Sequence, residues 1–300
     1  MTTHNRNLLV IFMGLLLVNV LFFFLGSQRT GVSFDENKFI LADTAGISNI
    51  QIGEGVALSK NTGKWRVNDQ YPADPSVRQL LFSILTRVKV KKPVDIEPEE
   101  GIEVAVGGAN PLNFRVWGNP TKTKTYFALT GSEEVYEVHI PGYNEYLGGL
   151  FELKPAQWRD RLVVDASWRT IQKLTLDYQQ SDDSDFTINF DKDFFVVEDI
   201  APIDSNAVVN YLNLFQLFQT NEWLSAGRFE KYDSLSKMPP LATLTIEAIN
   251  QEAPVVIDIF PKLSGDRFYL LMTYEGSMLV VDDRRMKEIL LKKEDFKYKK

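Results

Sequence analysis

The sequence contains two histidines, and their positions limit the metal or acid–base chemistry that they could share. His4 precedes an uncharged apolar stretch and His139 follows it, so a zinc site or a Ser/His/Asp triad would have to be built around His139 alone. His139 lies in an alternating stretch, Val135 to Ile140, which is typical of a strand and favours a structural role. We therefore predict no catalytic residue and no metal site.

Other motifs that could carry chemistry are incomplete. Gly53-Glu54-Gly55 lacks the third glycine of a dinucleotide loop, and Gly107-Gly108 lacks the lysine of a phosphate loop, so no cofactor is expected. Three aspartates at positions 182, 183 and 185 could ligate calcium, but their loop lacks the turn glycine and the distal glutamate. A glycan hydrolase remains a less favoured hypothesis, because it needs two carboxylates facing each other roughly 5 to 10 Å apart.

Composition excludes several classes of partner and stabilising bond. The 300 residues are 44% hydrophobic, which is enough for a sizeable core, and carry a net charge of −7. An acidic balance gives no broad basic surface for phosphates, so nucleic acid is not an expected partner. The absence of cysteine excludes disulfides and thiolate chemistry.

The N-terminus has the composition of a membrane span. No charged residue occurs from Asn7 to Gln28, and Leu8 to Leu25 is long enough to cross most of a hydrocarbon core of about 30 Å. A cleaved signal peptide is the alternative, but Phe22 to Ser27 is bulky where small residues are required. We predict a signal anchor that contacts the lipid bilayer through residues 8–26. The predicted localisation is the inner membrane, single-pass, with residues 1–30 as tail and anchor and the C-terminal domain extracytoplasmic.

Downstream patterning predicts two similar units after a stalk at residues 31–46. Phe186 to Asp199 overlies Val56 to Asp69 at a constant shift of 130, and an aspartate at the same shift precedes each predicted helix, at Asp74 and Asp204. Chance matches between short strands are the alternative explanation. The predicted fold class is α+β: an N-terminal transmembrane helix followed by two similar units, at residues 47–162 and 168–300, each an antiparallel sheet with a packed helix.

Helix and loop boundaries follow from the same patterns. The first helix begins at Pro75, with apolar positions at 77, 80, 81, 84, 85 and 88 on one face. The second helix is expected from Ser205 to about Thr220. The weakly patterned stretch from Ala226 to Pro240 is predicted to be an exposed connection.

Two segments are rich in the residue types that dominate protein interfaces. Tyr143 and Tyr146 lie among glycines, and Trp158 and Arg159 form an aromatic and charged pair. We select these four residues as the candidate interaction surface. The alternative is a structural role, in which these residues pack against the end of a sheet and Arg159 or Arg161 forms an ion pair with an aspartate.

Four short segments carry a family resemblance: Gly63 to Asn68, Tyr71 to Asp74, His139 to Tyr143, and Trp158 to Arg161. Together they resemble the bacterial family known as domain of unknown function 4340, especially its Bacteroidota members. The resemblance extends from about Phe34 to Arg161 and more weakly to the C-terminus. It implies one membrane span and an accessory extracytoplasmic subunit associated with an ABC-type transporter, with no catalytic residue to carry over.

The predicted function is a membrane-anchored, extracytoplasmic, non-enzymatic accessory or interaction protein with a membrane-protein partner in a transporter or envelope complex. An envelope glycan-binding or lipid-binding module is the alternative, since aromatic loops would serve it equally.

Overall fold

A computed structural model describes residues 34–97, 101–179 and 184–298, together with Met13, Gly14, Leu16 and Val18. No helix within these residues has the length and apolar character needed to cross a bilayer. The longest of them has 13 residues, whereas a span needs about 20. The predicted transmembrane helix, signal anchor and single-pass inner-membrane localisation are thereby contradicted. The predicted span at residues 8–26 lies almost entirely outside the described residues.

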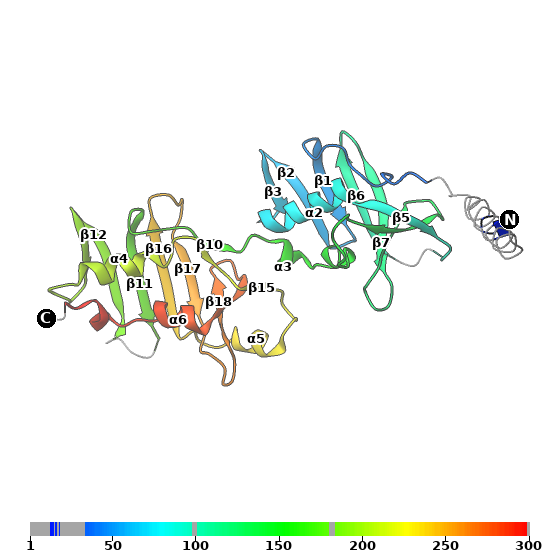
Figure 1. The fold of residues 1–300 in the computed structure, drawn as a ribbon. Coiled ribbons are helices and arrows are strands. Elements are labelled where there is room, and N and C mark those ends of the chain that lie inside the picture. Colours follow the sequence, from blue (N-terminus) through cyan, green and yellow to red (C-terminus); the bar gives the residue numbers. More distant parts are fainter. Residues whose placement is uncertain are drawn as a thin grey trace, which may run out of the picture.

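The fold is also more strongly β than the predicted helix-packed units, because strand residues, most of them in two large antiparallel sheets, clearly outnumber helical residues in the described chain (Figure 1). The first sheet has nine strands in the order β4-β3-β2-β1-β6-β7-β8-β9-β5. Their bounds are β1 (Ile47–Ile52), β2 (Val56–Asn61), β3 (Lys64–Val67), β4 (Tyr71–Pro72), β5 (Lys89–Val94), β6 (Ile102–Gly108), β7 (Leu112–Gly118), β8 (Thr125–Leu129) and β9 (Val135–His139).

The second sheet has eight strands in the order β13-β12-β11-β16-β17-β18-β19-β15. Their bounds are β11 (Ile171–Tyr178), β12 (Phe186–Asp191), β13 (Phe194–Val197), β15 (Glu222–Leu224), β16 (Ala242–Ala248), β17 (Val255–Ile259), β18 (Phe268–Thr273) and β19 (Met278–Asp282). A separate two-stranded ladder pairs β10 (Leu162–Val164) with β14 (Phe218–Gln219).

Short helices cover parts of these sheets. They are α2 (Pro75–Arg87), α3 (Pro155–Trp158), α4 (Ser205–Asn213), α5 (Glu230–Leu235) and α6 (Asp283–Ile289), with 3-10 turns η1 (Gly148–Leu150) and η3 (Lys293–Phe296). The predicted start of α2 is confirmed: the Asp74 carboxylate accepts hydrogen bonds from the backbone N–H groups of Ser76 (2.7 Å) and Val77 (3.2 Å). Asp204 caps α4 in the same way.

Two sequence-based boundaries are corrected by tertiary contacts. The predicted second helix reached about Thr220, but α4 ends at Asn213 because Phe218 belongs to β14 and pairs with Val164. The stretch from Ala226 to Pro240, expected to be an exposed connection, contains α5. Its Tyr232 and Leu235 are buried in a small cluster with residues of β15, β18 and β19.

The two sheets have the same strand order once the edge strand β4 is set aside. Strands β2 and β12 begin 130 residues apart, at Val56 and Phe186, and helices α2 and α4 begin 130 residues apart, at Pro75 and Ser205. Each central pairing also contains one register shift, between Ile47 and Asn49 in β1 and between positions 171 and 173 in β11.

Each half has its own core. In the first, Leu81, Ile84 and Leu85 of α2 pack on the sheet. The first core also includes Phe39 and Leu41, so the described part of the predicted stalk packs against the sheet instead of standing free. In the second core, α4 and η3 pack on strands β11 and β12 through an aromatic cluster.

The chain passes from one half to the other through α3 and β10, and the two halves adjoin where α3 contacts β15 (Figure 1). The Thr220 N–H donates to the Arg161 carbonyl (2.9 Å), and the Trp223 indole N–H donates to the Asp160 carbonyl (2.8 Å). Backbone groups of the connecting segment are therefore bonded to the second half.

Candidate functional site

The segment predicted to carry an interaction surface forms one wall of an apolar groove. The opposite wall is the outer face of α2, and the groove encloses about 600 Å³. Its lining residues are mainly apolar and aromatic: Leu80, Ser83, Ile84, Arg87, Ile140, Pro141, Gly142, Tyr143, Tyr146, Leu147, Gly149, Leu150 and Leu153. This volume falls in the range of ordinary small-molecule pockets.

Tyr146 is held in the floor of the groove by two glycines that leave room for its ring. A Cβ at Gly118 would lie 2.5 Å from the Tyr146 ring, and one at Gly148 would lie 2.2 Å from its hydroxyl oxygen. The hydroxyl donates to Glu152 at 2.8 Å. Burial, together with this carboxylate neighbour, raises the pKa of Tyr146 well above its ordinary value.

Two large side chains of the groove face solvent instead of the core. Leu80 is 52% exposed and Tyr143 is 47% exposed. Arg87, in the last turn of α2, is exposed at the edge of the groove and forms no ion pair with any described residue. The groove therefore combines unburied apolar surface with one unpaired positive charge.

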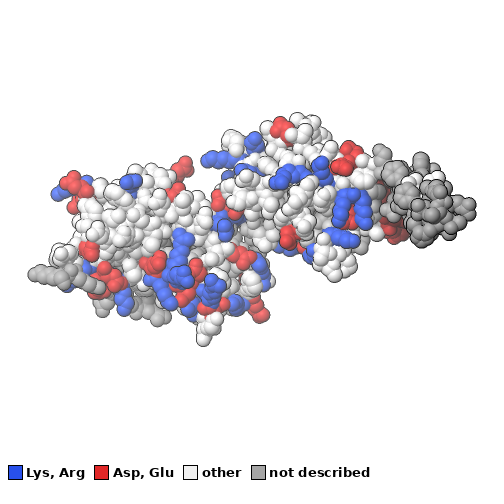
Figure 2. All heavy atoms as spheres, viewed as in Figure 1, with Lys and Arg blue, Asp and Glu red and all other residues white. Residues whose placement is uncertain are grey.

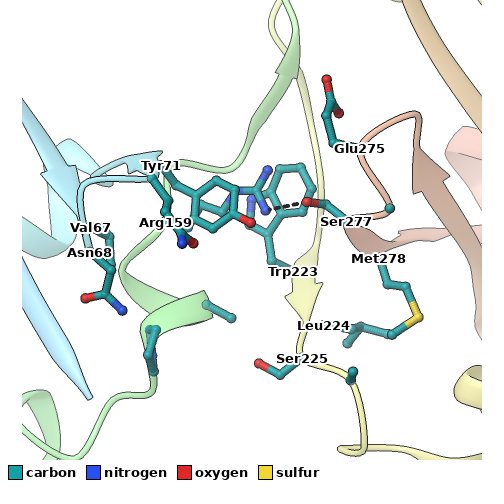
Figure 3. Close-up of a pocket in the computed structure, with 15 residues that line it drawn as sticks. Val67, Asn68, Tyr71, Arg159, Trp223, Leu224, Ser225, Glu275, Ser277 and Met278 are labelled. Carbon is teal, nitrogen blue, oxygen red and sulfur yellow. Dashed lines mark hydrogen bonds between the residues drawn. The ribbon is translucent and has the colours of Figure 1, made fainter. Parts of the chain in front are cut away.

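The other two predicted residues, Trp158 and Arg159, lie at the junction of the two halves. Trp158 is 0% exposed and belongs to the first core, so it offers no surface to a partner. Arg159 points the other way: its guanidinium lies between the ring of Tyr71, 3.8 Å from the ring centroid, and the ring of Trp223, at 3.4 Å (Figure 3). Tyr71 comes from the first half and Trp223 from the second.

The N–H groups of this guanidinium form few hydrogen bonds with the described residues. One terminal nitrogen, Nη1, donates to the Ser277 hydroxyl at 3.1 Å, drawn as the dashed line in Figure 3. No carboxylate of a described residue lies within ion-pair distance of Arg159. Burial lowers the pKa of Arg159, while Tyr71 and Glu275 act in the opposite direction. Arginine nevertheless keeps its charge at neutral pH.

Two hollows adjoin Arg159 and share Trp223 and Glu275 as lining residues. One encloses about 290 Å³ between β4, α3 and the β18–β19 turn, and includes Leu224 and Met278. The other encloses about 520 Å³ and is lined largely by apolar residues of β10 and β17, with Tyr274 at its edge. The smaller hollow also has polar lining residues, among them Asn68, Gln70 and Ser225, whereas the larger one is mainly apolar. Arg159 lines both hollows.

Charged side chains elsewhere on the visible face are largely compensated. Figure 2 shows Lys and Arg interspersed with Asp and Glu over the second half. Lys231 pairs with Asp266 at 2.7 Å, and Asp283 pairs with Lys262 and Lys287 at 2.7 Å each. Within residues 34–97, 101–179 and 184–298, no three His, Cys, Asp or Glu side chains gather in a way that could hold a metal ion.

The structure thus divides the four predicted residues between two sites, with Tyr143 and Tyr146 in the groove and Trp158 and Arg159 at the junction. Sequence reasoning missed Leu80, Tyr71 and Trp223 as site residues. Leu80 gave a signal, since it lies at the edge of the apolar stripe of α2, next to Leu81. Nothing local in the sequence connects Tyr71 with Trp223, which are 152 positions apart.

Comparison with known proteins gives no relative: no protein-family model, no curated protein and no solved structure matches the chain. The family resemblance stated from the four short segments therefore stays a prediction.

Proposed function

We propose that this chain is a non-enzymatic interaction protein that binds a protein partner in the groove between α2 and the segment from Pro141 to Leu153. The observation that carries the proposal is the outward position of Leu80 and Tyr143 in a groove of about 600 Å³. Large apolar side chains in contiguous exposed patches mark interaction sites more often than isolated ones do. Aromatic residues in such grooves commonly supply much of the binding energy.

The occupant that fits best is an amphipathic segment of a partner protein. Its apolar side chains would cover Leu80 and Tyr143, as in helix-in-groove recognition. An acidic residue beside them would face Arg87, whose charge has no partner in the described chain. We expect the partner to be a component of a transporter or another envelope complex, as the family resemblance implies.

Site-specific photocrosslinking tests this proposal in cells of the source organism. Benzoylphenylalanine would replace Leu80 in one variant and Tyr143 in another. A third variant carries it in place of Ile249, an apolar residue of the second half that is 68% exposed, as a control for nonspecific capture. The expected result is one common protein adduct from positions 80 and 143 that is absent from position 249 and is identified by mass spectrometry.

A charge-reversal variant tests whether the adduct forms in the groove. Arg87→Glu reverses the charge at the groove edge and should reduce the adduct from position 143 several-fold. Equal adducts from all three crosslinker positions, or none from positions 80 and 143, would overturn the proposal. Adducts with lipid or glycan in place of protein would favour the alternative binding-module function and contradict this one.

A further inference from the structure

A half-buried arginine that has no carboxylate of a described residue within ion-pair distance requires a physical explanation. Charged side chains are seldom buried unless they are paired, because desolvation of the charge is unfavourable. The rings of Tyr71 and Trp223 compensate part of this penalty for Arg159 through its two flat faces. Rings cannot satisfy the N–H donors, which point outward in the plane of the guanidinium.

The donors of Arg159 remain largely available. A guanidinium has five N–H groups, and the described residues accept one hydrogen bond from this one, at Ser277. The remaining donors include adjacent pairs with the parallel geometry that matches the two oxygens of a carboxylate. Stacking between two rings also fixes the orientation of the guanidinium before any ligand binds, which reduces the entropy lost on binding.

The duplicated architecture supplies an internal comparison for this position. Arg159 forms an isolated bridge with Ala73, and Lys297 forms the corresponding bridge with Ile203 in the second half. The Asp74 N–H donates to the Trp158 carbonyl at 2.8 Å, and the Asp204 N–H donates to the Phe296 carbonyl at the same distance. The second half thus has an exposed lysine at the position where the first half has a stacked arginine. The stacked guanidinium is therefore a feature of the junction and not of the repeated fold.

We propose that the junction binds a carboxylate carried on an apolar group. The free N–H groups of Arg159 would bind the carboxylate, and the adjoining hollows, the larger of which is mainly apolar, would hold the apolar group. The hollows of about 290 and 520 Å³ have room for an aliphatic or aromatic group beside the guanidinium. Glu275 lines both hollows, and its negative charge opposes a ligand more strongly the more negative charges that ligand carries, so the site favours monocarboxylates over more highly charged acids. The ligand is either a free organic acid or the C-terminal carboxylate of a peptide that ends in an apolar residue.

Calorimetric titration of the full-length protein with four probes tests the carboxylate requirement without altering the protein. The free-acid pair is hexanoate and hexanamide, and the peptide pair is acetyl-Gly-Gly-Leu with a free carboxylate and the same peptide as its amide. In at least one pair, the acid should bind at least tenfold more tightly than its amide. The stronger pair identifies the source of the ligand.

Variants then locate the site. Arg159→Gln should abolish acid binding, whereas Arg159→Lys should weaken it about tenfold, since it keeps the charge but loses the guanidinium. Lys297→Gln, at the corresponding position of the second half, should leave binding unchanged. The proposal is overturned if neither acid binds at 10 mM, if acid and amide bind equally, or if folded Arg159→Gln protein binds the acid as well as the wild type does. These outcomes are independent of the groove, whose occupant is tested by crosslinking.

Discussion

Replacing Arg159 by glutamine should destabilise the protein by about 2 kcal/mol, because several contacts of the junction depend on its guanidinium. Stacking on buried Trp223 is at the upper end of cation–π contacts, about 1 to 2 kcal/mol, and stacking on the more exposed Tyr71 is at the lower end, about 0.5 to 1 kcal/mol. The hydrogen bond to Ser277 contributes about 1 kcal/mol. Relief of the unfavourable burial of the charge offsets part of this loss.

A double-mutant cycle isolates the contact between the two halves. Arg159→Gln, Trp223→Leu and the double variant would be compared with wild type by urea denaturation of the full-length protein at 25 °C, monitored by circular dichroism. We expect a coupling free energy of about 1 to 2 kcal/mol between Arg159 and Trp223. Because the halves have separate cores, loss of the junction should also separate their unfolding transitions.

Arg169→Gln is the matched control for the cycle. Arg169 lies 5.2 Å from the ring of Trp168, but both residues are exposed, so its replacement should change stability by less than about 0.5 kcal/mol. A coupling free energy between Arg159 and Trp223 below about 0.3 kcal/mol would refute the junction contact as a stabilising one.

Three further predictions concern two helix caps, a buried carboxylate and a glycine. Asp74→Ala and Asp204→Ala should each lower the free energy of unfolding by about 1 kcal/mol in urea denaturation, since each removes the cap of a helix. For Glu137, burial raises the pKa, but hydrogen bonding and the charges of neighbouring lysines outweigh it and hold the pKa below the ordinary 4.5. The stabilisation of the folded protein by ionised Glu137 is therefore complete above about pH 4.5 and is lost as the pH falls through the lower folded-state pKa. Glu137→Gln should remove this pH dependence of stability in acid-titrated melts. Gly118→Ala should displace the ring of Tyr146 and destabilise the protein by about 1 to 3 kcal/mol in the same urea assay.

Features set by neighbouring residues were predictable from the sequence. The start of α2 follows from Asp74 and Pro75, whose capping and fixed φ act within one turn. The shift of 130 residues between β2 and β12 is visible because both strands are bounded by local turns. The transmembrane prediction is based on the composition of one segment, an uncharged apolar stretch of sufficient length, and the described helices do not bear it out.

Features set by distant pairing were not predictable. The end of α4 depends on Phe218 pairing with Val164, which no local pattern encodes. Trp158 and Arg159 are adjacent and were grouped together, but backbone of extended character at Arg159 sends their side chains in different directions. One therefore enters the first core, while the other stacks on Trp223 of the second half.

The exposure of Leu80 shows that burial is also hard to predict from the sequence within a single helix. Helical spacing places it at the margin of a stripe whose centre, at Leu81, Ile84 and Leu85, is buried. Whether such a margin is covered depends on the facing segment, which here leaves a groove beside Tyr143.

The affinity of the crosslinked partner for a Leu80→Glu variant tests the proposed docking groove most directly. Covering the exposed half of this leucine is worth about 1 kcal/mol, and a carboxylate in its place would also face the partner's acidic residue. We predict at least tenfold weaker binding to Leu80→Glu and unchanged binding to the matched Ile249→Glu variant. Equal affinities for both variants, with each protein folded as shown by its thermal melt, would contradict the groove as the docking site.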